Sequence, residues 1–170
     1  TRISFTNNTF PGVNNTTVFK TAGSEQDHIM GVYFADYDHQ EVLKFELEDG
    51  RYFSKEFATD SLAILLNEAA AKEFGFENPI GEEVLYNDNG STFKKYKVIG
   101  VIKNFNFESF KEEVRPLSIL LTKNADNLLI RYEGDPAAMI QNVERLWKQH
   151  AASEPFEYTF MDESFDRLFR

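Results

Sequence analysis

The strongest folding signal in this sequence is an apolar run that leads directly into a capped helix. Residues 62–66 are apolar over the length of a buried strand, and Asn67 follows them as a helix N-cap. Residues 68–74 then predict a helix, and Gly75 ends it by supplying the left-handed position that helix C-termini favour. A strand that continues into a helix requires a fold in which helices pack on a sheet.

Short alternating segments predict a strand-rich remainder. Strands are expected at 16–20, 29–34, 83–86, 96–102, 117–122, 127–132 and 156–160. Helices are expected at 37–45 with Asp36 as N-cap, at 137–150 after Asp135–Pro136, and from Asp162, while 48–51 indicates a turn. This alternation of strands and helices predicts mixed α/β or α+β packing.

Charge and cysteine content exclude several function classes. The chain has 28 acidic and 18 basic residues and a net charge of -10, so it repels nucleic acid and anionic lipid headgroups. No apolar run approaches the ~20 residues that a membrane-spanning helix needs. The absence of cysteine excludes thiolate catalysis and disulfides, and it favours an oxidising compartment. Because the chain opens within a predicted strand and stops within a predicted helix, we expect a segment of a longer protein.

No motif in the sequence assembles catalytic or cofactor chemistry. The glycines at 75, 81, 90 and 100 form neither a phosphate loop nor a dinucleotide fingerprint, and no serine lies in a Gly-x-Ser-x-Gly elbow. Asp36, Asp38 and His39 are the best candidate metal ligands, but acidic residues at a helix start are explained by the helix dipole. We therefore predict no catalytic, cofactor-binding or metal-binding residues.

Three aromatic residues after the predicted strand 96–102 are harder to explain. Phe105, Phe107 and Phe110 fall within seven residues of a predicted loop, and Arg115–Pro116 then indicates an extended crossing of the chain. The three rings either fill a junction between two lobes or face a partner protein. We favour the junction and name Phe105, Phe107, Phe110, Arg115 and Pro116 as candidate lobe-junction or partner-contact residues.

An ordered series of short segments resembles one known family. The segments are GRYFS at 50–54, AILLNEAA at 63–70, NPIG at 78–81, VIGVIKNF at 98–105, FESF at 107–110, RP at 115–116, FEY at 156–158 and DESF at 162–165. Each is weak alone, but together they resemble the periplasmic core domain of MacB-like, FtsX-related ABC transporter permeases. The resemblance spans nearly the whole chain.

The resemblance implies a fold with two lobes. A porter-like βαβ lobe, formed by residues 1–58 and 116–170, would be interrupted by an inserted, mostly β lobe of the kind called the sabre, formed by residues 59–115. The α+β class is therefore expected, with two chain crossings, near 57–60 and 110–116, acting as hinges. The closing segment is most similar to that of the second such domain in permeases that carry two.

The resemblance also implies a function without chemistry. The domain would lie on the periplasmic face of the bacterial cytoplasmic membrane, between transmembrane helices of the parent permease. It would relay motion driven by a cytoplasmic ABC ATPase to substrate or to a periplasmic partner protein, as part of a homodimer. Two alternatives remain open: a stand-alone periplasmic module that binds a ligand or peptide between its lobes, and a carboxylate-dependent hydrolase with converging acidic residues.

Overall fold

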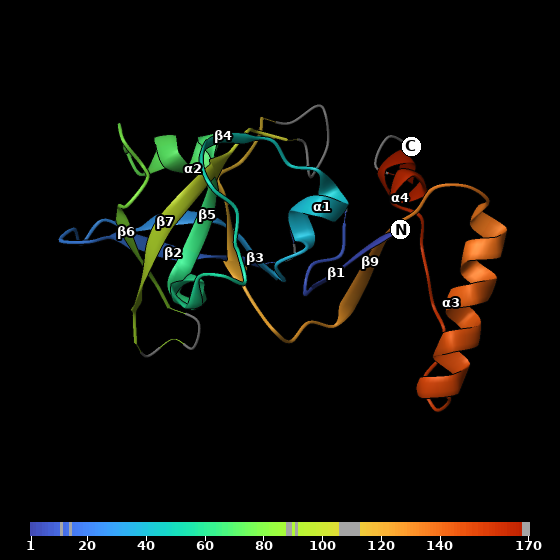
Figure 1. The fold of residues 1–170 in the computed structure, drawn as a ribbon. Helices are drawn as coiled ribbons and strands as arrows, with labels where there is room; N and C mark the ends of the chain where they lie inside the picture. Colours follow the sequence, from blue (N-terminus) through green and yellow to red (C-terminus); the bar gives the residue numbers. More distant parts are fainter. Residues whose placement is uncertain (11, 14, 88–89, 91, 106–112, 168–170) are drawn as a thin grey trace.

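A mixed sheet dominates the fold. The computed structural model describes residues 1–10, 12–13, 15–87, 90, 92–105 and 113–167, and Figure 1 shows their arrangement. The strands are β1 (Arg2–Thr6), β2 (Asn15–Thr21), β3 (His28–Ala35), β4 (Leu47–Gly50), β5 (Ala63–Asn67), β6 (Glu83–Tyr86), β7 (Lys94–Ile102), β8 (Leu117–Leu121) and β9 (Asn127–Arg131). The helices are α1 (His39–Leu43), α2 (Glu68–Glu73), α3 (Pro136–His150), α4 (Met161–Arg167) and the 3-10 turn η1 (Ala58–Leu62). This content confirms the predicted α+β class.

Six of the strands form a closed ring. The hydrogen-bonded order β2-β6-β7-β5-β8-β3 returns to its start because β3 also pairs with β2. The pairs β5–β7 and β3–β8 are parallel, and the other four are antiparallel. We call these six strands the ring. β4 pairs with β7, β1 meets β3 at a single residue pair, and β9 pairs with β1.

The inside of the ring holds one apolar core. Alternate residues of all six strands point inward, which is the period of two that strand geometry dictates. Phe19, Met30, Val32, Ile64, Leu66, Val84, Val98 and Leu120 are among the members of this core. Ala70 and Phe74 bring α2 and its C-terminus into the same cluster.

A second core covers the outer face of β3, β5 and β8. Its buried members include Tyr33, Ala63, Leu65, Leu117 and Ile119, which alternate along these strands with residues of the inner core. Partly buried side chains from the loops complete it, among them Phe10, Phe45 and Phe105. The central strands are therefore apolar on both faces, which accounts for the continuous apolar run at 63–66 in β5, whereas Leu62 ends η1 and is exposed.

Four elements, β1, β9, α3 and α4, lie to one side of the ring. β1 and β9 form a two-stranded extension at one end of β3, and α3 and α4 lie beyond it (Figure 1). We call β1, β9, α3 and α4 the outer part. The predicted caps of α3 are present, since both carboxylate oxygens of Asp135 accept hydrogen bonds from the amides of Ala137 and Ala138 at 3.2 Å. None of the residues of α3 or α4 that the structure describes is buried.

The predicted turn at 48–51 is wrong, because residues 47–50 form β4. Gly50 pairs with Gly100 of β7, and the two strands approach so closely that a Cβ at Gly50 would lie 2.3 Å from the carbonyl oxygen of Ile99. The backbone φ of +75° at Gly50 is also one that side chains disfavour. Pairing with a strand fifty residues later is not visible in the local sequence.

The predicted strand at 156–160 is also wrong, since these residues pair with no strand in the described part of the chain. The rings of Phe156, Tyr158 and Phe160 instead contact one another in series, and Phe156 contacts Trp147 of α3 with ring centroids 6.2 Å apart. Trp147 further donates its indole N–H to the carbonyl of Glu154 at 2.9 Å. Packing on α3 replaces sheet pairing here.

The first helix is shorter than predicted and begins later. α1 has Asp38 rather than Asp36 as its N-cap, and Asp38 makes no side-chain capping bond. The Asp36 carboxylate instead accepts hydrogen bonds from the Ser4 hydroxyl at 2.8 Å and from the Phe5 amide at 2.9 Å. Tertiary contacts with β1 therefore replace the local capping role.

The division into lobes 1–58 with 116–170 and 59–115 stays a prediction. Hydrogen-bonded strand pairs cross both proposed boundaries, since β5 pairs with β8 and β6 pairs with β2. Residues of the predicted insert, 59–115, and of the predicted porter-like lobe, 1–58 with 116–170, thus belong to the same ring.

Candidate functional site

The predicted junction residue Phe105 lies at the edge of the outer core. Its side chain is half-buried, and its ring centroid lies 4.5 Å from that of Phe45. Phe107 and Phe110 fall outside the residues that the structure describes. The assignment of these three rings to a lobe junction therefore stays a prediction, with Phe105 in a position that permits it.

The other two predicted residues lead into β8. Pro116 is half-buried and its carbonyl accepts a hydrogen bond from the amide of Gly31 at 3.0 Å. Arg115 is exposed, and its carbonyl accepts from the side-chain amide of Asn67 at 2.9 Å. Both residues thus position the start of β8 through their backbones, and their predicted part in a junction or partner contact stays untested.

Two asparagines hold the chain at both ends of residues 105–115, close to the N-terminus of α2. We call residues 105–115 the crossing. Asn67 is fully buried, and its side-chain oxygen accepts from the amides of Ala70 at 2.8 Å and Leu117 at 2.9 Å. Asn104 accepts from the amide of Ala69 at 3.0 Å, and its own amide donates to the Glu68 carboxylate at 2.7 Å. The end of β7, the start of β8 and the first turn of α2 are therefore joined by hydrogen bonds, which satisfy the free amides of a helix N-terminus. We call this group the asparagine clasp.

A buried ion pair fixes the chain before β5. Arg51 donates two hydrogen bonds to the fully buried Asp60, at 2.7 and 2.8 Å, and its guanidinium lies 4.1 Å over the ring of Phe57. Burial raises the pKa of the Asp60 carboxyl, but hydrogen bonds from Arg51 and from the Ser54 amide outweigh it and leave the pKa lowered. The sequence alone does not indicate this pair, because two residues nine positions apart in a loop carry no periodic signal.

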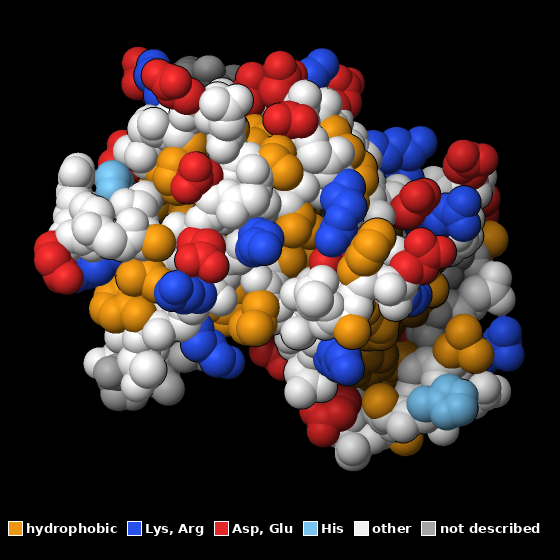
Figure 2. Space-filling view, turned by 60° about the vertical axis from the view of Figure 1, so that its left-hand side comes forward, with side chains coloured by type: hydrophobic (Ala, Val, Ile, Leu, Met, Phe, Trp, Pro, Cys, Tyr) orange, Lys and Arg blue, Asp and Glu red, His pale blue; other side chains and the backbone are white. Residues whose placement is uncertain are grey.

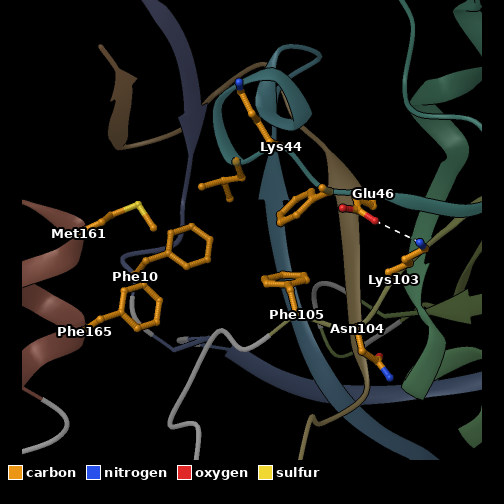
Figure 3. A pocket seen from close by; sticks show the side chains of 10 residues that line it. Phe10, Lys44, Glu46, Lys103, Asn104, Phe105, Met161 and Phe165 are labelled. Carbon is orange, nitrogen blue, oxygen red and sulfur yellow. Dashed lines mark hydrogen bonds and ion pairs between the residues drawn. The ribbon is translucent and has the colours of Figure 1, made fainter. Parts of the chain in front are cut away.

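A cleft of about 380 Å³ opens beside Phe105. Figure 3 shows Phe10 with Met161 and Phe165 of α4 along one side and Phe105 along the other. Phe45, which also lines the cleft, packs on Phe105. Glu46 and Lys103 form an ion pair of 3.1 Å at the cleft, and Lys44 rises from its rim (Figure 3). The cleft therefore brings the start of the crossing and α4 to opposite walls. The sequence pattern indicated Phe105 but not Phe45, Phe10 or the α4 residues, which only the tertiary fold brings together.

A chain of buried polar groups lies behind this cleft. The Tyr33 hydroxyl lies 3.0 Å from Nε2 of His39, and Nδ1 of His39 lies 2.9 Å from the Ser4 hydroxyl, which donates to Asp36. Because the Ser4 hydrogen is donated to Asp36, Nδ1 of His39 carries a hydrogen and donates it to the Ser4 hydroxyl. Near pH 7 the ring is neutral, so Nε2 accepts from the Tyr33 hydroxyl. Burial lowers the pKa of His39 to about 4, and the Asp36 carboxylate opposes this shift.

Neither the candidate metal ligands nor the carboxylate pair that a hydrolase would need is assembled among the described residues. Asp36, Asp38 and His39 form no metal-ligand group, and the part of the chain that the structure describes contains no cluster of three or more such ligands. Among the described residues that line the cleft, Glu46 is the acidic one, and it is paired with Lys103. Two carboxylates converging on a substrate, which the hydrolase alternative needs, are absent from these lining residues.

The surface charge is mixed rather than segregated. On the face drawn in Figure 2, lysine and arginine side chains are scattered among acidic ones and form no continuous basic stripe. The net charge of -10 also repels the phosphate backbone of nucleic acid. Both features disfavour nucleic acid as a partner. Within the described residues, none of the helices combines the length and the apolar character that crossing a bilayer requires.

Solved structures of transporter domains share this fold. The periplasmic region of MacB from Actinobacillus actinomycetemcomitans matches with a TM-score of 0.63 and 15% identity, covering 98% of this chain and 75% of that one. The extracellular domain of the noncanonic ABC-type transporter YknZ from Gram-positive bacteria matches with a TM-score of 0.62 and 17% identity, covering 89% and 76%. At these identities the structures establish similarity of fold.

The sequence itself matches one family over most of its length. No curated protein matches the chain, but the family model described as the MacB-like periplasmic core domain matches residues 3–144. This match confirms the resemblance drawn from the ordered segments. The chain therefore belongs to the family of MacB-like periplasmic core domains.

Proposed function

We propose that this domain relays ATP-driven motion from an ABC transporter permease to substrate or partner proteins in the periplasm, without catalysing a reaction itself. The proposal has two supports. One is membership of the MacB-like family. The other is a geometry in which a rigid ring and a loosely packed outer part meet across an aromatic cleft.

The ring has the properties of a rigid body. Its inner core is closed on all sides by strands, and its central strands are also covered outside by the second core. Close-packed protein interiors transmit displacement instead of absorbing it. The asparagine clasp joins residues 104, 115 and 117 to the N-terminus of α2, so a displacement of Phe105, next to Asn104, would move the ring.

The single observation that carries the proposal is the position of Phe105 opposite α4. Phe105 belongs to the crossing and packs on Phe45, while Met161 and Phe165 of α4 form the facing wall of the same cleft (Figure 3). α4 has no buried residue among those described, so the free-energy cost of moving it is small. A shift of α4 would widen or narrow the cleft and act directly on the crossing.

The proposal includes the setting of the domain. It lies on the periplasmic face of the cytoplasmic membrane, with membrane helices of the parent permease on either side of it. Its partners are a cytoplasmic ABC ATPase, a second copy of the permease and a periplasmic protein. The lobes 1–58 with 116–170 and 59–115, and their junction at Phe105, Phe107, Phe110, Arg115 and Pro116, belong to the same proposal.

Distance measurements in the complete transporter test the relay. Spin labels are attached to cysteines introduced at the exposed positions Lys97 in β7 and Asp166 in α4; this domain has no cysteine of its own, and any cysteine elsewhere in the permease is first replaced. A control pair, Thr16 in β2 with Lys97 in β7, lies within the ring. Pulsed electron paramagnetic resonance then compares the permease with its ATPase in the nucleotide-free and ATP-bound states.

We expect the distance between labels 97 and 166 to change on ATP binding while the distance between labels 16 and 97 stays constant. The first pair joins a strand of the ring to α4, so it reports movement of α4 relative to the ring. Both labels of the second pair lie in the ring. An unchanged 97–166 distance in a transporter that hydrolyses ATP contradicts the relay. A change within the control pair contradicts the rigidity of the ring.

A further inference from the structure

The cleft beside Phe105 has the composition of a ligand site as well as of a joint. Its walls are the rings of Phe10, Phe45, Phe105 and Phe165 with the thioether of Met161 (Figure 3). Its volume of about 380 Å³ falls within the range of ~300–1,000 Å³ that is typical of small-molecule sites. Aromatic walls and a flexible methionine suit an unbranched apolar chain, because they adapt to its shape.

The charges around the cleft favour an anionic group at its mouth. Among the described residues that line the cleft, the acidic residue is Glu46, and it is paired with Lys103 at 3.1 Å. The amine of Lys44 has no hydrogen-bond or ion-pair partner among the described residues. The Lys44 side chain extends from the rim of the cleft and points away from its aromatic side chains (Figure 3). A lysine amine without an ion-pair partner among the described residues thus lies just outside an apolar cleft.

We propose that the cleft binds one molecule of a long-chain carboxylate, such as a fatty acid. The apolar tail lies between the ring pair Phe45–Phe105 and the α4 side chains Met161 and Phe165, and the carboxylate remains in water at Lys44. Each methylene group of the tail that is removed from water adds to the free energy of binding. The headgroup then needs only an exposed ion pair, which a lysine on a flexible stem supplies.

The same arrangement discriminates against other amphiphiles. A cationic amphiphile of equal chain length would bring its charge to Lys44, where repulsion opposes binding. A non-ionic one gains the apolar contacts but not the ion pair. The preference for a carboxylate is therefore the distinguishing feature of the site, and it does not depend on whether the domain relays motion.

Calorimetric titration of the 170-residue chain with dodecanoate tests the proposal. Dodecyltrimethylammonium and dodecyl maltoside serve as cationic and non-ionic probes, and all three are kept below their micelle concentrations. We expect saturable binding of one dodecanoate per chain and weaker or undetectable binding of the other two.

Substitutions assign the binding to this cleft. Lys44→Gln should weaken dodecanoate binding about three- to fivefold, the effect of losing one exposed ion pair. Phe165→Ala should weaken it about tenfold or more by removing one aromatic wall. Lys72→Gln and Phe93→Ala, which change an exposed lysine and an exposed phenylalanine outside the cleft, should leave binding unchanged.

Several results would overturn the proposal. These are no saturable dodecanoate binding, equal binding of the cationic probe, or full affinity in both the Lys44→Gln and Phe165→Ala variants. Co-sedimentation of the chain with phosphatidylglycerol vesicles that contain no free fatty acid, unaffected by Phe165→Ala, would point to a lipid surface and also overturn it. Spin-label distances measured in the full transporter are independent of these outcomes, so the relay and the ligand site can fail separately.

Discussion

In the ring, strand after strand buries apolar side chains, whereas none of the described residues of β1, β9, α3 or α4 is a buried apolar residue. Ile64, Leu66 and Val98 are fully buried inside the ring, but Ile3, Phe5 and Leu146 of the outer part are 47%, 49% and 48% exposed. Burial of apolar surface is the main favourable term in folding. The comparison indicates that the ring determines the global stability and that the outer part can open or shift at a much lower free-energy cost.

The largest expected effect comes from a cavity in the ring. Leu66→Ala removes a fully buried side chain of the inner core and should lower the free energy of unfolding by about 2–5 kcal/mol. Leu146→Ala, the matched change in α3, removes a half-exposed side chain and should cost about 0.5 kcal/mol or less. Chemical denaturation of both variants measures the difference. Similar losses in the two variants would remove the contrast between the regions.

Acid should weaken the contact between the ring and the outer part through His39. The pKa of this buried histidine is lowered to about 4 in the folded chain, whereas an unfolded histidine titrates near ~6.5. Between these values the unfolded chain binds a proton that the folded chain does not, so stability falls as the pH drops through this window. The contribution amounts to about 3 kcal/mol in total and levels off below pH ~4.

His39→Gln should remove this contribution from the pH dependence of unfolding, measured by denaturation between pH 7 and pH 4. His150→Gln, at an exposed position of α3, is the control and should follow the parent chain. An identical pH profile for the parent chain and His39→Gln would show that the buried histidine is not responsible.

A smaller effect is expected at the ion pair before β5. Asp60→Asn leaves Arg51 without its buried carboxylate partner and should cost about 2 kcal/mol. Asp38→Asn breaks an exposed pair with Lys55 of 3.3 Å and should cost about 0.5 kcal/mol or less. Thermal unfolding of the two variants distinguishes a buried charge pair from a surface pair. Equal shifts in midpoint temperature would contradict the structural importance of Asp60.

The smallest effect concerns α3 alone. Asp135→Ala removes the N-cap and should destabilise the helix by about 1 kcal/mol. Because α3 contributes no buried residue, the loss should appear as faster amide exchange within α3 and not as a change in global unfolding. Lower global stability of comparable size would mean that α3 unfolds together with the ring.

The parts of the fold that local sequence encodes were predicted well. The strand, N-cap and helix at 62–75 appear as β5, Asn67 and α2, because capping and apolar runs act over a few residues. The α3 helix and its Asp135 cap follow for the same reason. β4 was missed because its partner β7 lies about fifty residues later in the chain, and the pairing of residues 47–50 with residues 100–102 leaves no local pattern. The closed ring was not predicted, since strand order depends on pairings between distant segments.

The candidate site was predictable only in part. Phe105 stood out as a large ring in a loop, and Asn67 as a helix cap. The other side-chain hydrogen bonds of Asn67 are to the backbones of Arg115 and Leu117, 48 and 50 positions later in the chain. No local sequence pattern predicts them. The facing wall of the cleft comes from α4, whose Met161 and Phe165 carry an ordinary helical spacing. Sequence thus indicated one wall of the site, and the tertiary fold supplied the other.

Hydrogen exchange resolved to single amides tests the contrast between the ring and the outer part most directly. We predict that amides in β5, β7 and β8 exchange only through global unfolding, with the full free energy of unfolding. Amides in α3 and α4 should exchange through local opening at a free energy several kcal/mol lower and should remain insensitive to Leu66→Ala. Equal opening free energies in the two regions, lowered together by Leu66→Ala, would contradict a rigid ring with an independently moving outer part.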